Sequence, residues 1–397
     1  MAINIQNLID AINTKVQALD SSSDITEINK LTRLTNNINS SGGVLEYRSL
    51  GELPDADSGN IGKLVYTQDK KYDDHGTFYF GVADGWQKIT LTADSDEGDY
   101  TIAASIPFGG TVAGYTSGGD PTTNNVINRF PFTTDANATG NGQLTVVRYF
   151  VTGHSSTTDA YVTGGLGAPG TGYNIIEKFP FAAAVPNATD VGDLVGGAIA
   201  DHAGNSDKAG GYGFTSGGVN PPSWTPLNRI EQFSFISNGN SVDFGDLFRV
   251  RQQNTGQSSS THGYCSGRGP TTVEFEKFPF VSNVVATVVG TLTTTRAAPS
   301  GQSSTTYGYN SGGLLVPNNA GSNIIDKFTF ASDANATFVG NLTVARGNST
   351  GQSSTTYGYN TGGYQNIIEK FSFTSDGNST DVGDLSAARG LMGGHEY

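Results

Sequence analysis

The sequence of 397 residues contains little of several features that mark common classes of protein. Its one cysteine, Cys265, excludes a disulfide within the chain and a zinc site built on cysteines, and we expect it to be a small buried side chain in a strand. Charged residues make up only 15% of the chain, and the net charge is -14. A negative charge of this size disfavours nucleic acid and anionic membrane surfaces as partners.

Long apolar runs are also missing. No stretch approaches the roughly 18 apolar residues that a membrane-spanning helix needs. The start Met1-Ala2-Ile3-Asn4 lacks the basic residues and the apolar run of a signal peptide. We therefore expect a soluble protein without membrane insertion that folds where it is made.

What the sequence does contain is a repeat. Tyr309-Asn310-Ser311-Gly312-Gly313 returns 50 residues later as Tyr359-Asn360-Thr361-Gly362-Gly363. The same template places the first glycine of the pair at six positions: Gly118, Gly164, Gly217, Gly267, Gly312 and Gly362. A fixed period of this size is typical of stacked or radial repeat proteins, and 54 glycines indicate the many tight turns of a mainly β chain.

Each repeat is predicted to form four strands. For the fifth unit we expect strand A around Gly301–Ser304, strand B over Thr305–Asn310, strand C over Ile324–Phe330 and strand D over Leu342–Arg346. Four strands in about 50 residues make one propeller blade. The apolar strand B, the paired glycines, the aromatic strand C and the following arginine resemble the kelch repeat, although kelch has a Trp after strand C and this chain has Thr, Val or Phe.

The spacing of the repeats also predicts how the ring closes. The leucine that opens strand D precedes the glycine of the next strand A by nine residues at five of the six junctions. The last such glycine, Gly394, aligns with Gly153. We therefore expect the C-terminus to supply strand A of the first blade, so that residues 98–397 form a six-bladed kelch-like propeller without open sheet edges.

Residues 1–41 have a helical pattern instead. Five apolar residues follow the a/d spacing of a coiled coil: Ile5, Ile9, Ile12, Val16 and Leu19. Asp24 and Glu27 read as a capping box that opens a second short helix. Because short isolated helices are marginal in water, we expect these to attach the chain to sister chains or to another protein. The alternative is that they pack on the next domain of their own chain.

Residues 42–97 are expected to form a small β spacer with strands near Lys63–Thr67, Thr77–Val82 and Trp86–Leu91. The opening helix Ile5–Val16, with Leu53-Pro54-Asp55 and the segment Gly76–Gln87, resembles the virion-attached ends of tail-fibre and other structural proteins of phages, marine cyanophages in particular. The resemblance covers about the first 90 residues. It implies a homo-oligomeric virion protein, assembled in the host cytoplasm, that contacts other virion proteins through its N-terminus.

Only the loops between strands B and C differ much in length from unit to unit, and all of them leave the propeller at one end. Variable loops on one face of a repeat fold usually mark the binding face, although drift in surface loops gives the same pattern. The candidate binding residues in these loops are Asp120, Asn124, Tyr173, Trp224, Arg268, Asn318 and Tyr364. The partner that we expect is a host surface glycan or protein.

Motifs for catalysis are few. Ser241–Phe248 fits the Asp-box of sialidase-like propellers, which cleave glycans. The five arginines that recur once per blade are expected to bond blade to blade: Arg148, Arg251, Arg296, Arg346 and Arg389. The pairs Asp135/Asn137, Asp333/Asn335 and Asp376/Asn378 read as Asx turns rather than calcium loops, and no histidine has metal-site spacing. We therefore expect no enzyme activity, no cofactor and no metal.

Taken together, these patterns predict a phage virion structural protein whose propeller acts in a tail fibre or another host-recognition appendage, as a receptor-binding domain. Two alternatives stay open. One is a glycan-active, sialidase-like propeller enzyme, and the other is a purely structural adaptor between virion proteins.

Overall fold

The computed structural model describes residues 109–397 except 122–123, 269–272 and 282–284, and five strands nearer the N-terminus. Contacts divide the chain into two units, Met1–Ile106 and Pro107–Tyr397. The five strands of the first unit form one sheet in chain order: β1 (Leu45–Tyr47), β2 (Leu64–Thr67), β3 (Thr77–Val82), β4 (Gly85–Ala93) and β5 (Tyr100–Ala104). The predicted N-terminal helices, with Ile5, Ile9, Ile12, Val16 and Leu19, lie outside the described residues, and the spacer role of residues 42–97 stays a prediction.

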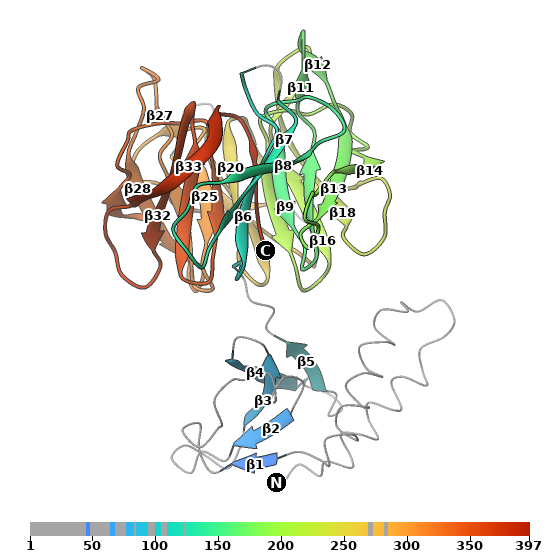
Figure 1. Cartoon of the computed structure of the whole chain (residues 1–397), viewed down its shortest axis with the longest axis vertical. Helices are drawn as coiled ribbons and strands as arrows, with labels where there is room; N and C mark the ends of the chain where they lie inside the picture. The colour runs from blue at the N-terminus through green and yellow to red at the C-terminus, as the bar shows by residue number, and fades with distance from the viewer. Residues whose placement is uncertain are drawn as a thin grey trace. The chain divides into compact units, whose positions relative to one another are not determined.

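The second unit is a six-bladed β-propeller, in which six sheets surround one axis (Figure 1). We number the blades I to VI and letter their strands A to D outwards, because the A strands contact one another around the axis. Blade I consists of β34 (Gly393–Glu396), β6 (Ala113–Ser117), β7 (Val126–Pro131) and β8 (Thr139–Gln143). Blade II consists of β9 (Thr152–Ser155), β10 (Asp159–Thr163), β13 (Ile175–Pro180) and β14 (Thr189–Asp193).

The other blades repeat this plan. Blade III consists of β15 (Ala203–Asp207), β16 (Tyr212–Ser216), β18 (Thr225–Ser234) and β19 (Val242–Arg251). Blade IV consists of β20 (Asn254–Ser258), β21 (His262–Gly267), β22 (Glu274–Pro279) and β23 (Thr287–Thr291). Blade V consists of β25 (Ser300–Ser303), β26 (Tyr307–Ser311), β28 (Ile324–Thr329) and β29 (Thr337–Asn341). Blade VI consists of β30 (Ser349–Ser353), β31 (Tyr357–Gly362), β32 (Gln365–Ser372) and β33 (Thr380–Arg389).

Short strands add to three of the connections. They are β11 (Leu166–Gly167) with β12 (Thr171–Gly172), β17 (Val219–Asn220) on β18, and β24 (Arg296–Ala297) with β27 (Leu314–Leu315). Among the residues that the structure describes, no helix is long and apolar enough to cross a membrane.

Strand D lies earlier in the repeat than we predicted. We expected it over Leu342–Arg346 in the fifth unit, but the outer strand is β29, Thr337–Asn341. The side chains of β29 are mostly exposed or half-buried, so this outer strand carries a weak apolar signal. Leu342 is buried just beyond the end of the strand. Because it is apolar, we placed the predicted strand over Leu342 and the residues after it. In blades III and VI the strand does continue as far as Arg251 and Arg389.

The blades pack through one aromatic contact that occurs at every junction. A ring on strand B packs against the second Phe of the Phe-x-Phe pair in the next blade, with ring centroids 4.7–5.2 Å apart. The six pairs are Tyr115–Phe181, Tyr161–Phe235, Phe214–Phe280, Tyr264–Phe330, Tyr309–Phe373 and Tyr359–Phe132. Such pairs add about 0.5–1.5 kcal/mol each to the burial of their area.

Glycines let the six strands A pack closely around the axis. Each strand A carries one glycine at which an added Cβ would overlap the preceding blade. At five of the six positions, the nearest atom is the carbonyl oxygen of the equivalent glycine in that blade. The six glycines are Gly153, Gly204, Gly256, Gly301, Gly351 and Gly394. The ring is completed by β34, which pairs antiparallel with β6 and places His395 opposite Tyr115. The C-terminal strand thus occupies the strand A position of blade I.

Candidate functional site

The loops between strands B and C and the connections from strand D to the next strand A share one end of the propeller, which we call the loop face. Backbone bridges join the two sets directly, as between Tyr149 and Leu166 and between Ala200 and Val219. The short strands β11, β12 and β27 lie at this end (Figure 1).

At the centre of the loop face, six residues form a closed ring, which we call the axial ring: Phe150, Asp201, Gln253, Ala298, Asn348 and Leu391. Each lies three positions before a strand A glycine and has a left-handed backbone, with φ of 46–60°. Each N–H donates to the carbonyl oxygen of the equivalent residue in the neighbouring blade, at 2.8–3.3 Å. The circle of six hydrogen bonds is complete.

The axial ring repeats its backbone but not its side chains. A left-handed conformation costs a residue other than glycine about 1–2 kcal/mol, and such backbone strain gathers at functional sites. Three members are apolar (Phe150, Ala298 and Leu391) and three are polar (Asp201, Gln253 and Asn348). The ring therefore presents an asymmetric set of side chains on a symmetric frame.

A channel runs along the axis from this ring and encloses a cavity of about 160 Å³. Strand A residues of all six blades line it, together with every member of the axial ring except Gln253. At the end away from the loop face, Lys208 Nζ lies 3.4 Å from Glu396 Oε1 and links blade III to blade I. Both of these side chains are largely buried, and both line that end of the channel.

One carboxyl group stands out in the electrostatics of the site. Burial raises the pKa of Asp201 to about 7, against the opposite effects of the Gln253 backbone N–H and the Arg268 charge. Asp201 therefore changes its charge near neutral pH, at the mouth of the channel.

Two of the predicted binding residues contact members of the axial ring, and a third packs beside it. Trp224 is 49% exposed and meets the ring of Phe150 edge-on, with centroids 6.1 Å apart. Arg268 Nη1 donates to Gln253 Oε1 at 2.9 Å. Tyr364, which is 43% exposed, packs over Gly390, the residue before Leu391.

A fourth predicted residue, Asp120, forms a hydrogen bond with Tyr364. Burial, followed by the nearby charge of Asp120 and a hydrogen bond to its carboxylate, raises the pKa of the Tyr364 phenol to about 12. Asp120 belongs to blade I and Tyr364 to blade VI, so the two join neighbouring loops.

The other three predicted residues serve their own loops. Asn124 Oδ1 accepts from the backbone N–H of Val126, and Asn318 Oδ1 accepts from that of Ala320. Tyr173 packs over Gly167 of the same loop. The axial ring itself was not predicted, because its six side chains have nothing in common; only their fixed position three residues before the strand A glycine would have identified it.

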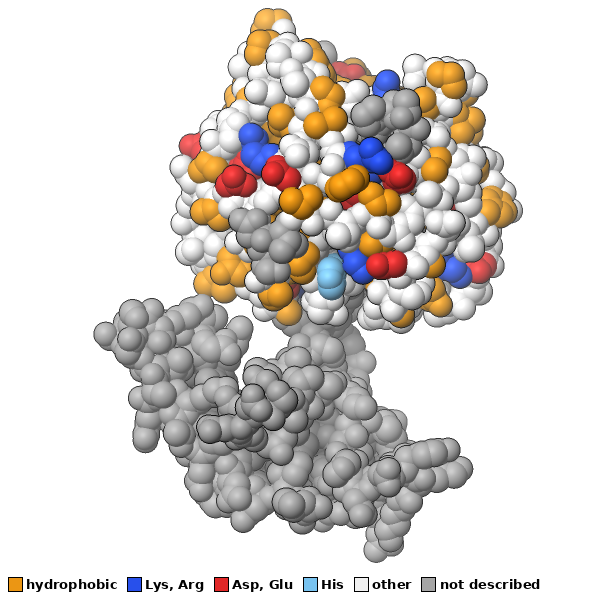
Figure 2. All heavy atoms as spheres, turned by 180° about the vertical axis from the view of Figure 1, so that it is seen from behind, with side chains coloured by type: hydrophobic (Ala, Val, Ile, Leu, Met, Phe, Trp, Pro, Cys, Tyr) orange, Lys and Arg blue, Asp and Glu red, His pale blue; other side chains and the backbone are white. Residues whose placement is uncertain are grey.

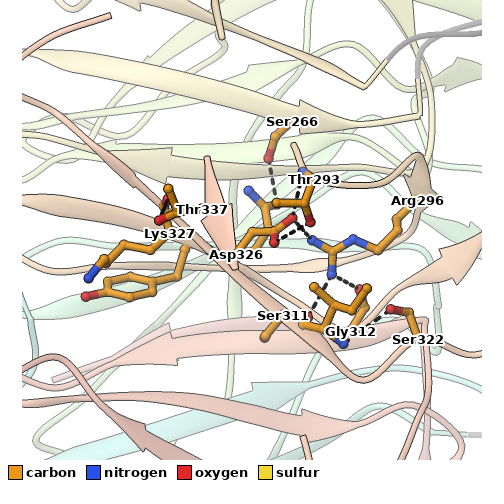
Figure 3. Close-up of polar contacts among 12 residues, drawn as sticks. Ser266, Thr293, Arg296, Ser311, Gly312, Ser322, Asp326, Lys327 and Thr337 are labelled. Atoms are coloured by element: carbon orange, nitrogen blue, oxygen red, sulfur yellow. Dashed lines mark hydrogen bonds and ion pairs between the residues drawn. The ribbon is translucent and has the colours of Figure 1, made fainter. Parts of the chain in front are cut away.

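The repeated arginines bond blade to blade, as predicted. Four of the five reach from the end of one blade to a buried carboxylate on strand C of the next: Arg148–Glu177 at 3.3 Å, Arg251–Glu276 at 2.8 Å, Arg296–Asp326 at 2.6 Å and Arg346–Glu369 at 3.1 Å. Figure 3 shows Arg296 also donating to the carbonyl oxygen of Gly312. Arg389 instead donates to the Gly118 carbonyl oxygen and to Thr116 Oγ1.

The Asp/Asn pairs also bond between blades, which corrects our assignment of local Asx turns. Asn335 Oδ1 accepts from Thr291 N and Asn378 Oδ1 from Asn341 N, each in the preceding blade. The aspartates pair with lysines of that preceding blade: Lys277–Asp333, Lys327–Asp376 and Lys370–Asp135. Figure 2 shows one face of the propeller, on which several acidic and basic side chains lie beside one another. Within residues 109–397, apart from the undescribed gaps, no group of three or more His, Cys, Asp or Glu could hold a metal.

Comparisons with known proteins give a likeness of fold. No protein-family model matches the sequence, and no curated protein matches it. Among solved structures, that of YjhT is similar, with a TM-score of 0.50 and 12% sequence identity over 62% of this chain and 87% of YjhT. At this identity, the chain is similar to YjhT in its fold alone.

Proposed function

We propose that the propeller is a recognition domain that binds carbohydrate, without cleaving it, at the mouth of the axial channel. The observation that carries this proposal is the axial ring. Six residues with the same strained, left-handed backbone carry six different side chains, and an asymmetric set of groups around one opening suits an asymmetric ligand.

The surroundings of the ring suit a sugar. Trp224 and Tyr364 are both exposed, and both have left-handed backbones, with φ of 54° and 63°. Aromatic faces pack on the C–H faces of sugars, while amide and carboxyl groups such as those of Asn348 and Asp201 bind hydroxyls.

Binding without turnover is favoured because the repeated charged groups already have partners. A sialidase-like enzyme needs an arginine cluster free to hold the substrate carboxylate. The repeated arginines Arg148, Arg251 and Arg296 are buried against carboxylates between blades. Ser241, in the segment that resembles an Asp-box, donates to Glu231 inside blade III.

The virion setting of this domain rests on the sequence resemblance of the first 90 residues or so. In this proposal the N-terminal segment attaches several copies to other virion proteins, and the propellers recognise the host surface. Weak single sites then gain strength from being linked on one particle. An adaptor between virion proteins is the competing role.

The test measures binding of the full chain to an array of neutral and acidic oligosaccharides, together with release of free sugar. The double variant Trp224→Ala/Tyr364→Ala should lose binding while melting at the wild-type temperature. Phe338→Ala is the matched control, because Phe338 is an aromatic residue 54% exposed on the outer strand β29. Sugar release would overturn the proposal in favour of an enzyme, and binding to virion proteins with none to glycans would favour the adaptor.

A further inference from the structure

One buried position on strand C carries a charge in five blades and none in the sixth. The five blades have a fully buried carboxylate there: Glu177, Glu231, Glu276, Asp326 and Glu369. The equivalent residue of blade I is Asn128, which is buried as completely but is uncharged. The difference falls at the junction between blades VI and I.

Blades IV and V show the arrangement with the carboxylate present (Figure 3). Arg296 Nη2, from the end of blade IV, lies 2.6 Å from Asp326 Oδ2 on strand C of blade V. Thr293 Oγ1, also from the end of blade IV, donates to Asp326 Oδ1 at 2.6 Å. The buried guanidinium and the buried carboxylate balance each other, which is the condition under which charges are tolerated inside a protein.

The junction between blades VI and I keeps the arginine but lacks the carboxylate. Arg389 is fully buried and donates only to neutral oxygens: the carbonyls of Gly118 and Val126 at 2.7 and 3.0 Å, and Thr116 Oγ1 at 3.2 Å. Burial lowers the pKa of Arg389 to about 10, and no carboxylate of the described residues acts against it. Arg389 therefore still carries its charge at neutral pH.

Asn128 replaces only part of the missing carboxylate. Its Oδ1 accepts from the backbone N–H and the hydroxyl of Ser386 in blade VI, at 3.0 and 2.9 Å. Because an N–H can only donate, the amide oxygen must face Ser386, and Nδ2 lies on the other side of the amide. That Nδ2 has no hydrogen-bond partner among the described residues. The junction thus contains a buried positive charge without a negative one, and a buried donor without an acceptor.

A second junction also departs from the repeat, but its charges are balanced. Blade II has Ala198 where the other blades have the repeated arginine. Glu231 of blade III instead lies 2.5 Å from Arg229 of its own strand, and Arg229 Nη1 donates to the Gly196 carbonyl oxygen of blade II at 3.0 Å. Within the described part of the propeller, the unbalanced arginine is therefore confined to the junction between blades VI and I.

We propose that the junction between blades VI and I is a seam, at which the closed ring separates before any other junction does. A buried charge without a partner regains its hydration when the blades separate, so opening costs less free energy here than at a balanced junction. The other repeated contacts are present at the seam, such as the stacked Tyr359–Phe132 pair and the Lys370–Asp135 ion pair. The missing carboxylate is what sets this junction apart.

The seam crosses the loop face. Asp120 of blade I and Tyr364 of blade VI form a hydrogen bond across it, and the backbones of Asp120 and Gly390 exchange two more at 2.9 and 3.0 Å. Opening would break these contacts and separate two of the predicted binding residues, so this part of the loop face is complete only while the seam is shut. The seam is a property of the ring and is independent of the proposed carbohydrate binding.

Six equivalent backbone amides report on the six junctions. Each donates, at 2.7–2.9 Å, to a carbonyl oxygen on strand D of the preceding blade: Ala138, Ala188, Ser241, Ala286, Ala336 and Ser379. Hydrogen exchange of the full chain, followed amide by amide by NMR and corrected for intrinsic rates, measures their protection. Ala138, at the seam, should be protected about tenfold less than the other five, because a charge-assisted hydrogen bond is missing there.

Asn128→Asp tests the cause. The variant gives Arg389 a carboxylate of the size of the present amide, and blade V already uses an aspartate at this position. The protection of Ala138 should rise about tenfold, while that of the other five amides stays unchanged. Asp326→Asn is the matched reverse change. It leaves Arg296 without its carboxylate, so Ala336 should lose about as much protection as Ala138 gains.

Three results would overturn the seam. The first is equal protection of the six amides in the wild-type protein. The second is an Ala138 amide that exchanges as fast in Asn128→Asp as in the wild type, with Ala336 unaffected by Asp326→Asn, because the carboxylate would then not control opening. The third is fast exchange of Ala138 together with the amides of β34, which would mean that blade I unfolds as a unit and that the blades do not separate.

Discussion

One position in each strand A shows how far a side chain can vary while its task stays the same. The residue after the strand A glycine is buried in every blade: His154, Asn205, Gln257, Gln302, Gln352 and His395. Each bonds a carbonyl oxygen of the next blade, as His395 does with that of His154 and Gln352 with that of Tyr115. Histidine, asparagine and glutamine are interchangeable here because each offers an N–H at a similar reach.

The histidines make this position sensitive to acid. Burial lowers the pKa of His154 to about 4 and that of His395 to about 3, against 6.5 for an unperturbed histidine. The unfolded chain therefore binds more protons than the folded one below pH 6.5. Their contribution to stability is complete above that pH and is lost as the pH falls towards the folded values, by up to about 1.4 kcal/mol per pH unit for each histidine.

The double variant His154→Gln/His395→Gln should therefore fold and lose less stability between pH 7 and pH 5 than the wild type does. Glutamine already fills this position in three blades, so the junctions keep their hydrogen bonds. The raised pKa of Asp201 acts in the opposite direction but is common to both proteins. Urea unfolding at each pH measures the difference, and equal slopes in the two proteins would contradict the assignment.

Only part of the candidate site could be predicted from individual residues of the sequence. Trp224, Arg268 and Tyr364 could be predicted from the sequence because they lie in loops of unequal length. Trp224 and Arg268 contact members of the axial ring, and Tyr364 packs over Gly390 beside it. Phe150 and Asp201 were not accessible, because their role comes from backbone geometry and not from residue type.

At the scale of elements, the repeat predicted strands A, B and C well and strand D poorly. Strands A to C are buried between blades, and their glycines and aromatics carry a strong pattern. The outer strand packs on one side only, so the buried Leu342 beyond it gave a stronger signal than the strand itself. The sequence pattern indicates which residues are buried. At the outer edge of a blade, the buried residues do not coincide with the residues of the strand.

Strand A is the element with the least freedom. We predict that Gly301→Ala lowers the free energy of unfolding by about 3 kcal/mol or more, because the new Cβ overlaps the Gly256 carbonyl oxygen and neither backbone can move without opening the axis. Gly377→Ala is the matched control, since its Cβ would meet nothing within 4 Å. Its effect should stay within about 0.5 kcal/mol. Thermal and urea unfolding compare the two, and a Gly301→Ala protein as stable as the control would show that the strands can separate.

For the whole molecule, the six equivalent junctions make the ring a closed set of contacts. The circle of hydrogen bonds in the axial ring and the circle of aromatic pairs both continue across the junction between blades VI and I. That junction and the adjoining blade I also hold the last strand of the chain. The number of blades could be predicted because each repeat unit forms one blade. The set of side chains in the axial ring could not be predicted, because it depends on how the blades pack together.

Removing Gly393–Tyr397 tests this closure. Blade I would lose β34, leaving β6 as an open edge, and His395 would leave its site beside His154. Tyr397, which stacks on Phe181 with centroids 5.1 Å apart, would be lost as well. The melting temperature should fall by about 10 °C or more, because a deficit of several kcal/mol shifts a unit of this size by about 2–4 °C per kcal/mol.

A peptide that carries the removed strand should repair the same truncation. A synthetic peptide of residues 390–397 should bind the truncated chain by adding a strand to β6 and restore most of the lost stability. A peptide of the same composition in scrambled order should have no effect, because the glycine of strand A and the following histidine must keep their register. A truncated chain that melts at the wild-type temperature would mean that the ring is held without its last strand.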